Sequence, residues 1–129
     1  MDIDIIGTYK SVDGNLILEI QKSEPINSKF SGTLNVKNSP VGDVSYTISN
    51  GEWYYTNNRD IAAFQFKVAN IDASVNPDDR EYIIMDSWAG FLTRDGEFKA
   101  SISRSYVHKN GTRELFAFNT VVFVKQKQE

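Results

Sequence analysis

The sequence predicts an all-β fold, an eight-stranded antiparallel up-and-down meander that closes into a barrel. Apolar residues recur at every second position through most of the chain, which is the period of a strand. No segment combines helix caps with a 3.6-residue apolar stripe. Short clusters of Gly, Asn, Asp and Ser separate the alternating segments, so neighbouring strands are expected to pair in sequence order.

The amino-terminal half divides into four alternating segments. The expected strands are residues 5–10, 16–22, 30–36 and 44–48. The first two form a hairpin across the turn signal Ser11-Val12-Asp13-Gly14. Asn50-Gly51 is typical of a tight hairpin turn because both residues tolerate positive φ, and residues 52–56 after it are a candidate short extra strand.

The carboxy-terminal half reads as a longer and cleaner meander. Its expected strands are residues 62–68, 81–92, 97–107 and 113–125, and residues 70–79 form the longest loop. The last three strands are joined by the turns Arg94-Asp95-Gly96 and Lys109-Asn110-Gly111-Thr112. Strands connected in this way remove their exposed edges by closing into a barrel, the fold we expect, or by packing as two sheets.

Length and charge limit the class of protein. The 129 residues have the length of one domain, so we expect a single barrel domain over residues 1–129. The absence of cysteine excludes disulfides and thiolate metal sites. The 14 basic and 17 acidic residues are interspersed and give a net charge of −3, without the basic stripe that phosphates require. A nucleic-acid partner is therefore not expected.

The amino-terminal segment carries no targeting signal of the secretory kind. Residues 1–6 lack a positively charged region followed by a long apolar run, and no apolar run approaches membrane-spanning length. We therefore expect a cytoplasmic protein with no membrane partner. A secreted protein from which the signal peptide had been removed would give the same reading.

The turn Arg94-Asp95-Gly96 sets a register that brings two opposite charges together. A three-residue loop with Gly96 at positive φ places Thr93 opposite Glu97 and Asp86 opposite Arg104. The same register pairs Trp88 with Ile102 and Ile84 with Tyr106 on one face, while the other face carries Ser101, Ser103 and Ser105. A charge inside a barrel is costly unless it is paired, so Asp86 and Arg104 are expected to form an internal ion pair.

Two interpretations of this ion pair remain open. In the first, the two charges neutralise each other in a small barrel that is filled by side chains. In the second, they line a ligand cavity with aromatic walls and with polar contacts at one end. The walls would be Trp88 and Tyr106.

No residue pattern predicts catalysis. His108 is the only histidine and lies at a strand end without a second metal ligand or a nucleophile nearby in sequence. Asp86 with Tyr106 is the only acid and base combination on the interior face. We therefore expect no enzyme, no metal and no cofactor. Residues 53–55, Trp-Tyr-Tyr, form either an exposed aromatic platform or part of the core packing.

The final strand is apolar on both sides. Strict alternation places Leu115, Ala117, Val121 and Phe123 on one face and Phe116, Phe118, Val122 and Val124 on the other. A barrel strand has only one inward face, so the outward row would be an exposed apolar patch unless another chain covered it. We therefore expect a homodimer or homotetramer through this strand and its neighbours.

Five short motifs follow one another along nearly the whole chain. They are Gly7-Thr8-Tyr9 with Asp13-Gly14-Asn15-Leu16, Phe30-Ser31-Gly32-Thr33, residues 63–68, Asp86-Ser87-Trp88-Ala89-Gly90 and Val122-Phe123-Val124-Lys125. Their order and spacing resemble those of the avidin and streptavidin family of biotin-binding barrels. The resemblance implies an avidin-like barrel that binds a small molecule and whose subunits associate across barrel walls.

The positions that hold biotin in that family are mostly altered here. The resemblance implies a ring of polar contacts around the ureido group, from an Asn and a Ser in the first turn, a Tyr on the third strand and an Asp on the last, between tryptophan walls. The first-turn positions fall on Ser11 and Asn15, the Tyr on Leu34 and the Asp on Val121. Trp88 keeps its type, whereas the other tryptophan positions fall on Val68 and Tyr106.

A buried site that is built for hydrogen bonds loses affinity when its polar groups are removed, by about 1 to 3 kcal/mol for each unmatched group. We therefore expect a small-molecule-binding barrel in which biotin binding is weak or lost. The candidate ligand-binding residues are Ser11, Asn15, Leu34, Asp86, Trp88, Arg104 and Tyr106. The alternative is a protein-interaction or protease-inhibitor-type barrel with a filled lumen.

Overall fold

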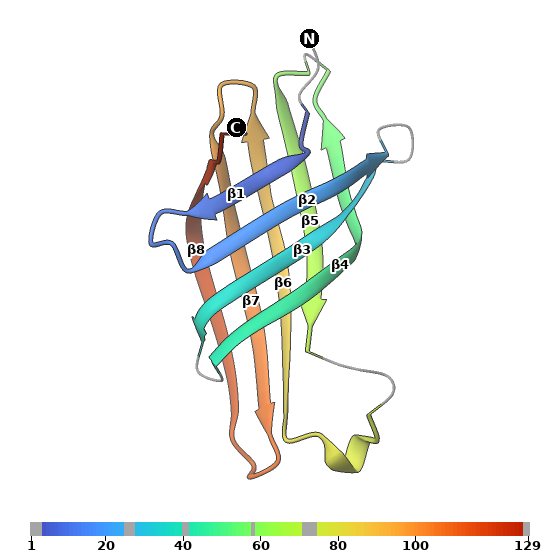
Figure 1. The fold of residues 1–129 in the computed structure, drawn as a ribbon, viewed down its shortest axis with the longest axis vertical. Helices are drawn as coiled ribbons and strands as arrows, with labels where there is room; N and C mark the ends of the chain where they lie inside the picture. Colours follow the sequence, from blue (N-terminus) through green and yellow to red (C-terminus); the bar gives the residue numbers. More distant parts are fainter. Residues whose placement is uncertain (1–3, 25–27, 40–41, 58, 71–74, 128–129) are drawn as a thin grey trace.

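The chain forms a closed antiparallel barrel of eight strands in sequence order, with the first strand paired to the last (Figure 1). The structure is a computed structural model, and it describes residues 4–24, 28–39, 42–57, 59–70 and 75–127. Each strand pairs antiparallel with the strand that precedes it. The predicted fold class, an up-and-down barrel rather than two separate sheets, is confirmed.

The eight strands differ in length between the two halves of the barrel. They are β1 (Gly7–Ser11), β2 (Leu16–Glu24), β3 (Lys29–Ser39), β4 (Gly42–Tyr55), β5 (Ile61–Ala69), β6 (Tyr82–Thr93), β7 (Phe98–His108) and β8 (Arg113–Lys125), with a short 3₁₀ turn at Pro77–Asp79. In Figure 1 β1 to β4 cross diagonally over β5 to β8, and β6, β7 and β8 extend past them at the lower end. One wall of the barrel therefore projects beyond the other.

The predicted turn at Asn50-Gly51 is wrong, because both residues lie inside the single long strand β4. Gly51 does not adopt positive φ, unlike Gly14, Gly96 and Gly111 in the turns. A Cβ added at Gly51 would lie 2.4 Å from ring carbons of Phe30, its partner on β3. The glycine therefore serves close packing against an aromatic ring, and residues 52–55 continue β4 instead of forming an extra strand.

The strict alternation expected along β8 is also wrong. Its register against β7 shifts between Ala100 and Ile102, so that Val121 faces Ala100 while Phe118 faces Ile102. This bulge inserts one extra residue in β8 and reverses the faces beyond it. The inward row is therefore Phe116, Phe118, Val121 and Phe123, and the outward row is Leu115, Ala117, Val122 and Val124. Both faces remain apolar, as the sequence indicated.

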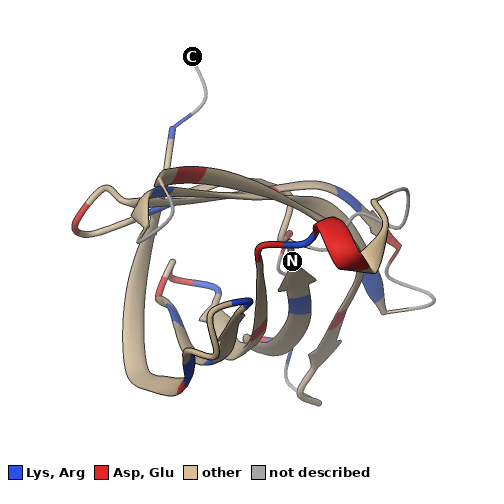
Figure 2. Cartoon of the chain, turned by 90° about the horizontal axis from the view of Figure 1, so that it is seen from below, with Lys and Arg blue, Asp and Glu red and all other residues tan. Residues whose placement is uncertain are grey.

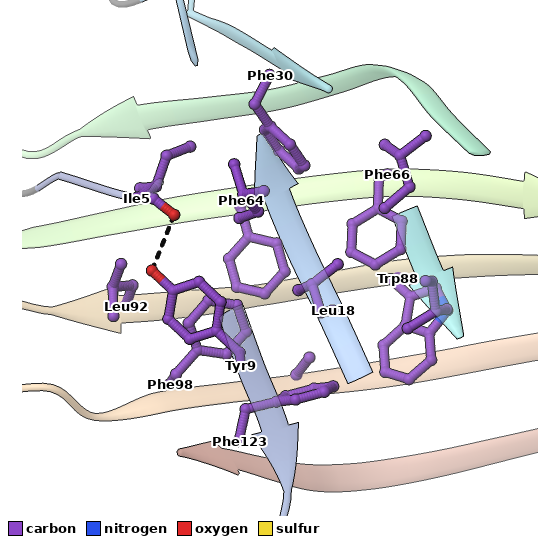
Figure 3. Close-up of a cluster of buried hydrophobic side chains, with 14 of the residues drawn as sticks. Ile5, Tyr9, Leu18, Phe30, Phe64, Phe66, Trp88, Leu92, Phe98 and Phe123 are labelled. Carbon is purple, nitrogen blue, oxygen red and sulfur yellow. Dashed lines mark hydrogen bonds between the residues drawn. The ribbon is translucent and has the colours of Figure 1, made fainter. Parts of the chain in front are cut away.

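An aromatic cluster fills one end of the lumen (Figure 3). Tyr9 stacks on Phe98 with ring centroids 4.5 Å apart, and Phe98 in turn contacts Phe64 and Phe123. The Tyr9 hydroxyl donates a hydrogen bond to the Ile5 carbonyl at 2.8 Å, which satisfies it in the core. Burial raises the pKa of Tyr9 far above its ordinary value. This end of the barrel is closed by packed side chains.

Charged residues are distributed around the barrel. Figure 2 shows basic and acidic segments interspersed over the strands and turns, with the acidic 3₁₀ turn at one end. The described charges therefore form no continuous stripe of one sign.

No helix in the described ranges has the length and apolar character needed to cross a membrane.

Candidate functional site

A cavity of about 720 Å³ opens at the end of the barrel opposite the aromatic cluster. Its wall is formed by the turn between β1 and β2, the end of β3 and the inward faces of β6, β7 and β8. The lining residues are Ser11, Val12, Asp13, Asn15, Leu16, Val36, Lys37, Asn38, Ser39, Trp88, Ile102, Arg104, Phe118, Thr120, Val121 and Val122. The volume lies within the range typical of pockets for small organic ligands.

The predicted ion pair between β6 and β7 lies beside this cavity. Asp86 and Arg104 are opposed in the ladder, as the register of the Arg94-Asp95-Gly96 turn predicted. The Arg104 Nε and Nη2 groups donate to Asp86 Oδ1 and Oδ2 at 2.8 and 2.9 Å, so the pair is bidentate. The Asp86 side chain is 0% exposed and that of Arg104 is 18% exposed. The predicted ion pair is therefore confirmed, and only its cation reaches the cavity.

The pair also affects its surroundings electrostatically. The hydrogen bonds that Arg104 donates to Asp86 raise the pKa of Arg104, so the guanidinium stays charged. Tyr46, buried on β4, faces the same charges. Burial is the main reason why the pKa of Tyr46 is raised, and the charge of Asp86 raises it further. A buried phenol thus lies beside the ion pair, and the cation of that pair lines the cavity.

Trp88 forms the boundary between the aromatic cluster and the cavity. Its indole stacks on Phe66 at 5.7 Å and 12°, and it contacts Phe123 at 6.0 Å. The residue is 2% exposed, yet its Nε1 group has no hydrogen-bond partner within the described chain. In Figure 3 the nitrogen lies on the side of the ring turned away from Tyr9 and Phe98. A buried donor without an acceptor therefore borders the cavity.

Ser11 is committed to the turn that follows β1. Its hydroxyl donates to Asp13 Oδ1 at 2.6 Å and accepts from the Leu16 amide at 3.0 Å. Asp13 Oδ1 also accepts from the Asn15 amide, and the hydrogen bond from Ser11 is the main reason why the pKa of Asp13 is lowered. The residue lines the cavity, but its donor is already used.

Asn15 connects this turn to the neighbouring hairpin. Its Oδ1 accepts from Asn38 Nδ2 at 3.2 Å, and its carbonyl accepts from the Lys37 amide at 2.8 Å. The two hydrogen bonds hold the β1–β2 turn against the end of β3. The rim of the cavity is therefore fixed by local polar contacts.

Two of the candidate residues from the sequence lie away from the cavity. Leu34 is fully buried in the core and is not part of the cavity wall. Tyr106 follows Ile102 by four residues on β7, which corresponds to about 13 Å along a strand, and it lines a separate surface groove with Arg113 and Glu114. Trp88 and Tyr106 are therefore not opposite walls of one cavity.

Several lining residues were not predicted from the sequence. Phe118 joins Val121 on the inward face because of the β8 bulge, and Lys37 reaches the rim because β3 ends there. No local sequence signal marks these positions. The apolar run of β8 was the one available indication, since it is too apolar for a single inward face.

The remaining aromatic and titratable candidates do not form a site. Trp53 is buried and contacts Tyr55 edge to face at 4.7 Å, whereas Tyr54 points outward and donates to Glu52. Core packing is thus the interpretation that holds for Trp53. His108 Nδ1 accepts from the Asn110 amide within its turn. Over the described ranges, no three His, Cys, Asp or Glu side chains gather where they would hold a metal ion.

Comparison with known proteins identifies a similar fold. No protein-family model and no curated protein matches the sequence. The X-ray structure of a biotin binding protein from chicken superposes with a TM-score of 0.61 and covers 98% of both chains at 14% sequence identity. At this identity the likeness establishes the avidin-like barrel fold alone.

Proposed function

We propose that the protein is a non-enzymatic barrel that binds a small molecule in the cavity at its open end. The observation that carries this proposal is the cavity of about 720 Å³, which combines apolar walls with Trp88 and Arg104. Pockets of this size with a few convergent polar groups are typical of sites for organic ligands. The protein of similar fold from chicken is a biotin binding protein.

Biotin itself is proposed to bind weakly or not at all. At the positions where the resemblance implies a Tyr and an Asp, the chain has the fully buried Leu34 and the cavity-lining Val121. Ser11 already donates to Asp13, so its hydroxyl has no proton left for a ligand. A ureido group in this cavity would leave polar atoms unmatched, each at a cost of about 1 to 3 kcal/mol.

The experiment is titration calorimetry with biotin and a panel of biotin-like compounds, alongside thermal melting. A ligand that binds the native state raises the melting temperature by mass action. Tight stoichiometric biotin binding would refute the argument from the lost polar groups. A panel without any response would refute a biotin-like ligand and favour either a different class of ligand or the alternative of a barrel that presents its surface to a protein partner.

We further propose that the outer face of β8 and its neighbours is covered by a second copy of the chain, in a homodimer or homotetramer. The outward row on β8 is exposed, and Leu115 is 86% exposed. Val122 and Val124 lie on the same outer face, and the outer faces of β7 and β6 add Val107, Met85 and Phe91, with Ser105 between Met85 and Leu115 and Lys99 between Phe91 and Val122. Apolar residues gathered on one outer face in this way are unusual on a monomer. Sedimentation as a monomer at micromolar concentration would contradict this proposal.

A further inference from the structure

We propose that the cavity takes a small carboxylic acid with an apolar body, whose carboxylate accepts hydrogen bonds from Arg104 and Trp88. This inference rests on the proposed function of the cavity and narrows its ligand to one chemical class. Three features of the site support it: the unused donors of Arg104, the unpartnered donor of Trp88, and the charge of the lining surface.

The guanidinium of Arg104 has donors left after it binds Asp86. An arginine carries five N–H groups, and the two that point to Asp86 come from Nε and Nη2. Nothing else among the described residues accepts a hydrogen bond from Arg104. The edge of the fork formed by Nη1 and Nη2 is therefore free. This edge matches the two oxygens of a second carboxylate.

Trp88 supplies a further donor on the same side. Its Nε1 is a donor only, so it is satisfied by an acceptor and by nothing else. Asp86 precedes Trp88 by two residues on the same inward face, about 7 Å along the strand. The indole nitrogen lies on the side of the ring away from the aromatic cluster (Figure 3). A carboxylate held by Arg104 therefore supplies the acceptor that the indole Nε1 lacks.

The charges that a ligand meets favour an anion over a cation. The charged lining residues are Lys37, Arg104 and Asp13, two positive and one negative. Asp13 Oδ1 is already engaged by Ser11 and Asn15, and the Asp86 carboxylate contributes no exposed surface. An amine would thus meet two cations and one carboxylate whose Oδ1 is already engaged. The remaining wall, with Val36, Ile102, Phe118 and Val121, suits an apolar body.

The test follows the two indole N–H signals of the ¹⁵N-labelled protein by NMR during titration with 4-phenylbutanoate and with 4-phenylbutanamide. The chain has two tryptophans, so Trp53→Phe assigns both signals and is the matched control, since Trp53 is also buried with an unpartnered Nε1 but does not line the cavity. The acid is expected to shift the Trp88 signal and to leave that of Trp53 in place. It is expected to bind about tenfold more tightly than the amide, because charge-assisted hydrogen bonds are about twice as strong as neutral ones.

The double variant Asp86→Asn with Arg104→Gln removes both charges without stranding either of them. In this variant the acid and the amide are expected to bind with about equal affinity, whereas an unchanged preference for the acid would overturn the proposal. Should the double variant not fold, Arg104→Lys keeps the charge but loses the fork. The preference is then expected to fall severalfold, and an unchanged preference would again overturn the role of the guanidinium.

The remaining outcomes separate this inference from the proposed function. Equal binding of acid and amide, or a shift of the Trp53 signal instead of that of Trp88, would overturn the carboxylate site. Binding of biotin and of biotin amide with equal affinity, without binding of either probe, would overturn the carboxylic acid class and leave the small-molecule function standing. Binding of nothing from either set would overturn both.

Discussion

Removal of Arg104 should destabilise the barrel more than removal of Asp86, although the two residues share one ion pair. Arg104→Met leaves the Asp86 carboxylate, which is 0% exposed, without its cation. Breaking a buried pair in this way typically costs about 3 to 5 kcal/mol. Asp86→Asn instead leaves the Arg104 side chain, which is 18% exposed and borders the cavity, so the guanidinium regains water. The expected loss is the difference between charged and neutral hydrogen bonds, about 1 to 2 kcal/mol.

The assay is urea unfolding at neutral pH followed by tryptophan fluorescence, with the free energy of unfolding obtained by linear extrapolation. The matched control is the double variant Asp86→Leu with Arg104→Met, which replaces the pair by apolar side chains of similar size. Replacement of a buried pair in this way is often neutral or stabilising, so the double variant should be more stable than Arg104→Met alone. With the single variant Asp86→Leu added, the cycle of wild type, Asp86→Leu, Arg104→Met and the double variant gives the coupling free energy of the pair.

Two results would refute this reasoning. The first is a loss below about 1 kcal/mol for Arg104→Met, which would mean that Asp86 is hydrated and not sealed behind the arginine. The second is a larger loss for Asp86→Asn than for Arg104→Met. That order would place the buried charge on Arg104 and contradict the difference in exposure between the two side chains.

Three further predictions concern the packing and the outer surface. Gly51→Ala should cost about 1 to 3 kcal/mol in urea unfolding, because the new Cβ meets the Phe30 ring, and Phe30→Leu should restore part of the loss. Tyr9→Phe should weaken the loss of stability at alkaline pH. Burial raises the pKa of Tyr9, so its stabilising contribution is present below about pH 10 and is lost as the pH rises further. Above pH 10 the free energy of unfolding of the variant should therefore fall less steeply with pH than that of the wild type, by up to about 1.4 kcal/mol per pH unit. Leu115→Lys should shift the sedimentation of the protein toward the monomer, whereas Val75→Lys, also at an exposed apolar residue, should not.

The register of the β6–β7 hairpin was predictable because a local feature determines it. Gly96 adopts φ of +97°, and the Thr93 amide donates to the Glu97 carbonyl at 2.8 Å, which closes a three-residue loop. Once the loop is fixed, every pair further along the hairpin follows, including Asp86 with Arg104. The identity of the internal ion pair could therefore be derived without knowledge of the rest of the barrel.

The errors arose where a distant strand decides the local structure. Asn50-Gly51 has the composition of a hairpin turn, but the glycine is required by the Phe30 ring of β3, 21 residues earlier in the chain. The alternation along β8 is interrupted by a bulge that is defined only relative to Ala100 and Ile102 of β7. A sequence pattern reports the preference of each residue, and neither close approach nor register against a remote strand is written in it.

The cavity was only partly predictable for a related reason. Trp88 and Arg104 were identified from the hairpin register, and Ser11 and Asn15 from the first-turn positions that the resemblance to the avidin family implies. The separation of Tyr106 from the cavity depends on how far β7 extends beyond β3 and β4, which is a relation between the two walls of the barrel. The length of each wall is a tertiary property, so the residues at the mouth could not be distinguished from those beyond it.

The unequal walls also explain why a charged pair is tolerated next to an aromatic core. Where β1 to β4 cover the longer sheet, the lumen is filled by rings from Tyr9 to Trp88. One step further along β6 and β7 the lumen opens beside the first turn and the end of β3, and the Arg104 side chain reaches the cavity while Asp86 remains sealed. A buried carboxylate requires its cation, and a cation with one open side still has donors for a second acceptor. The same geometry that stabilises Asp86 in the fold therefore presents the unused edge of Arg104 to the cavity.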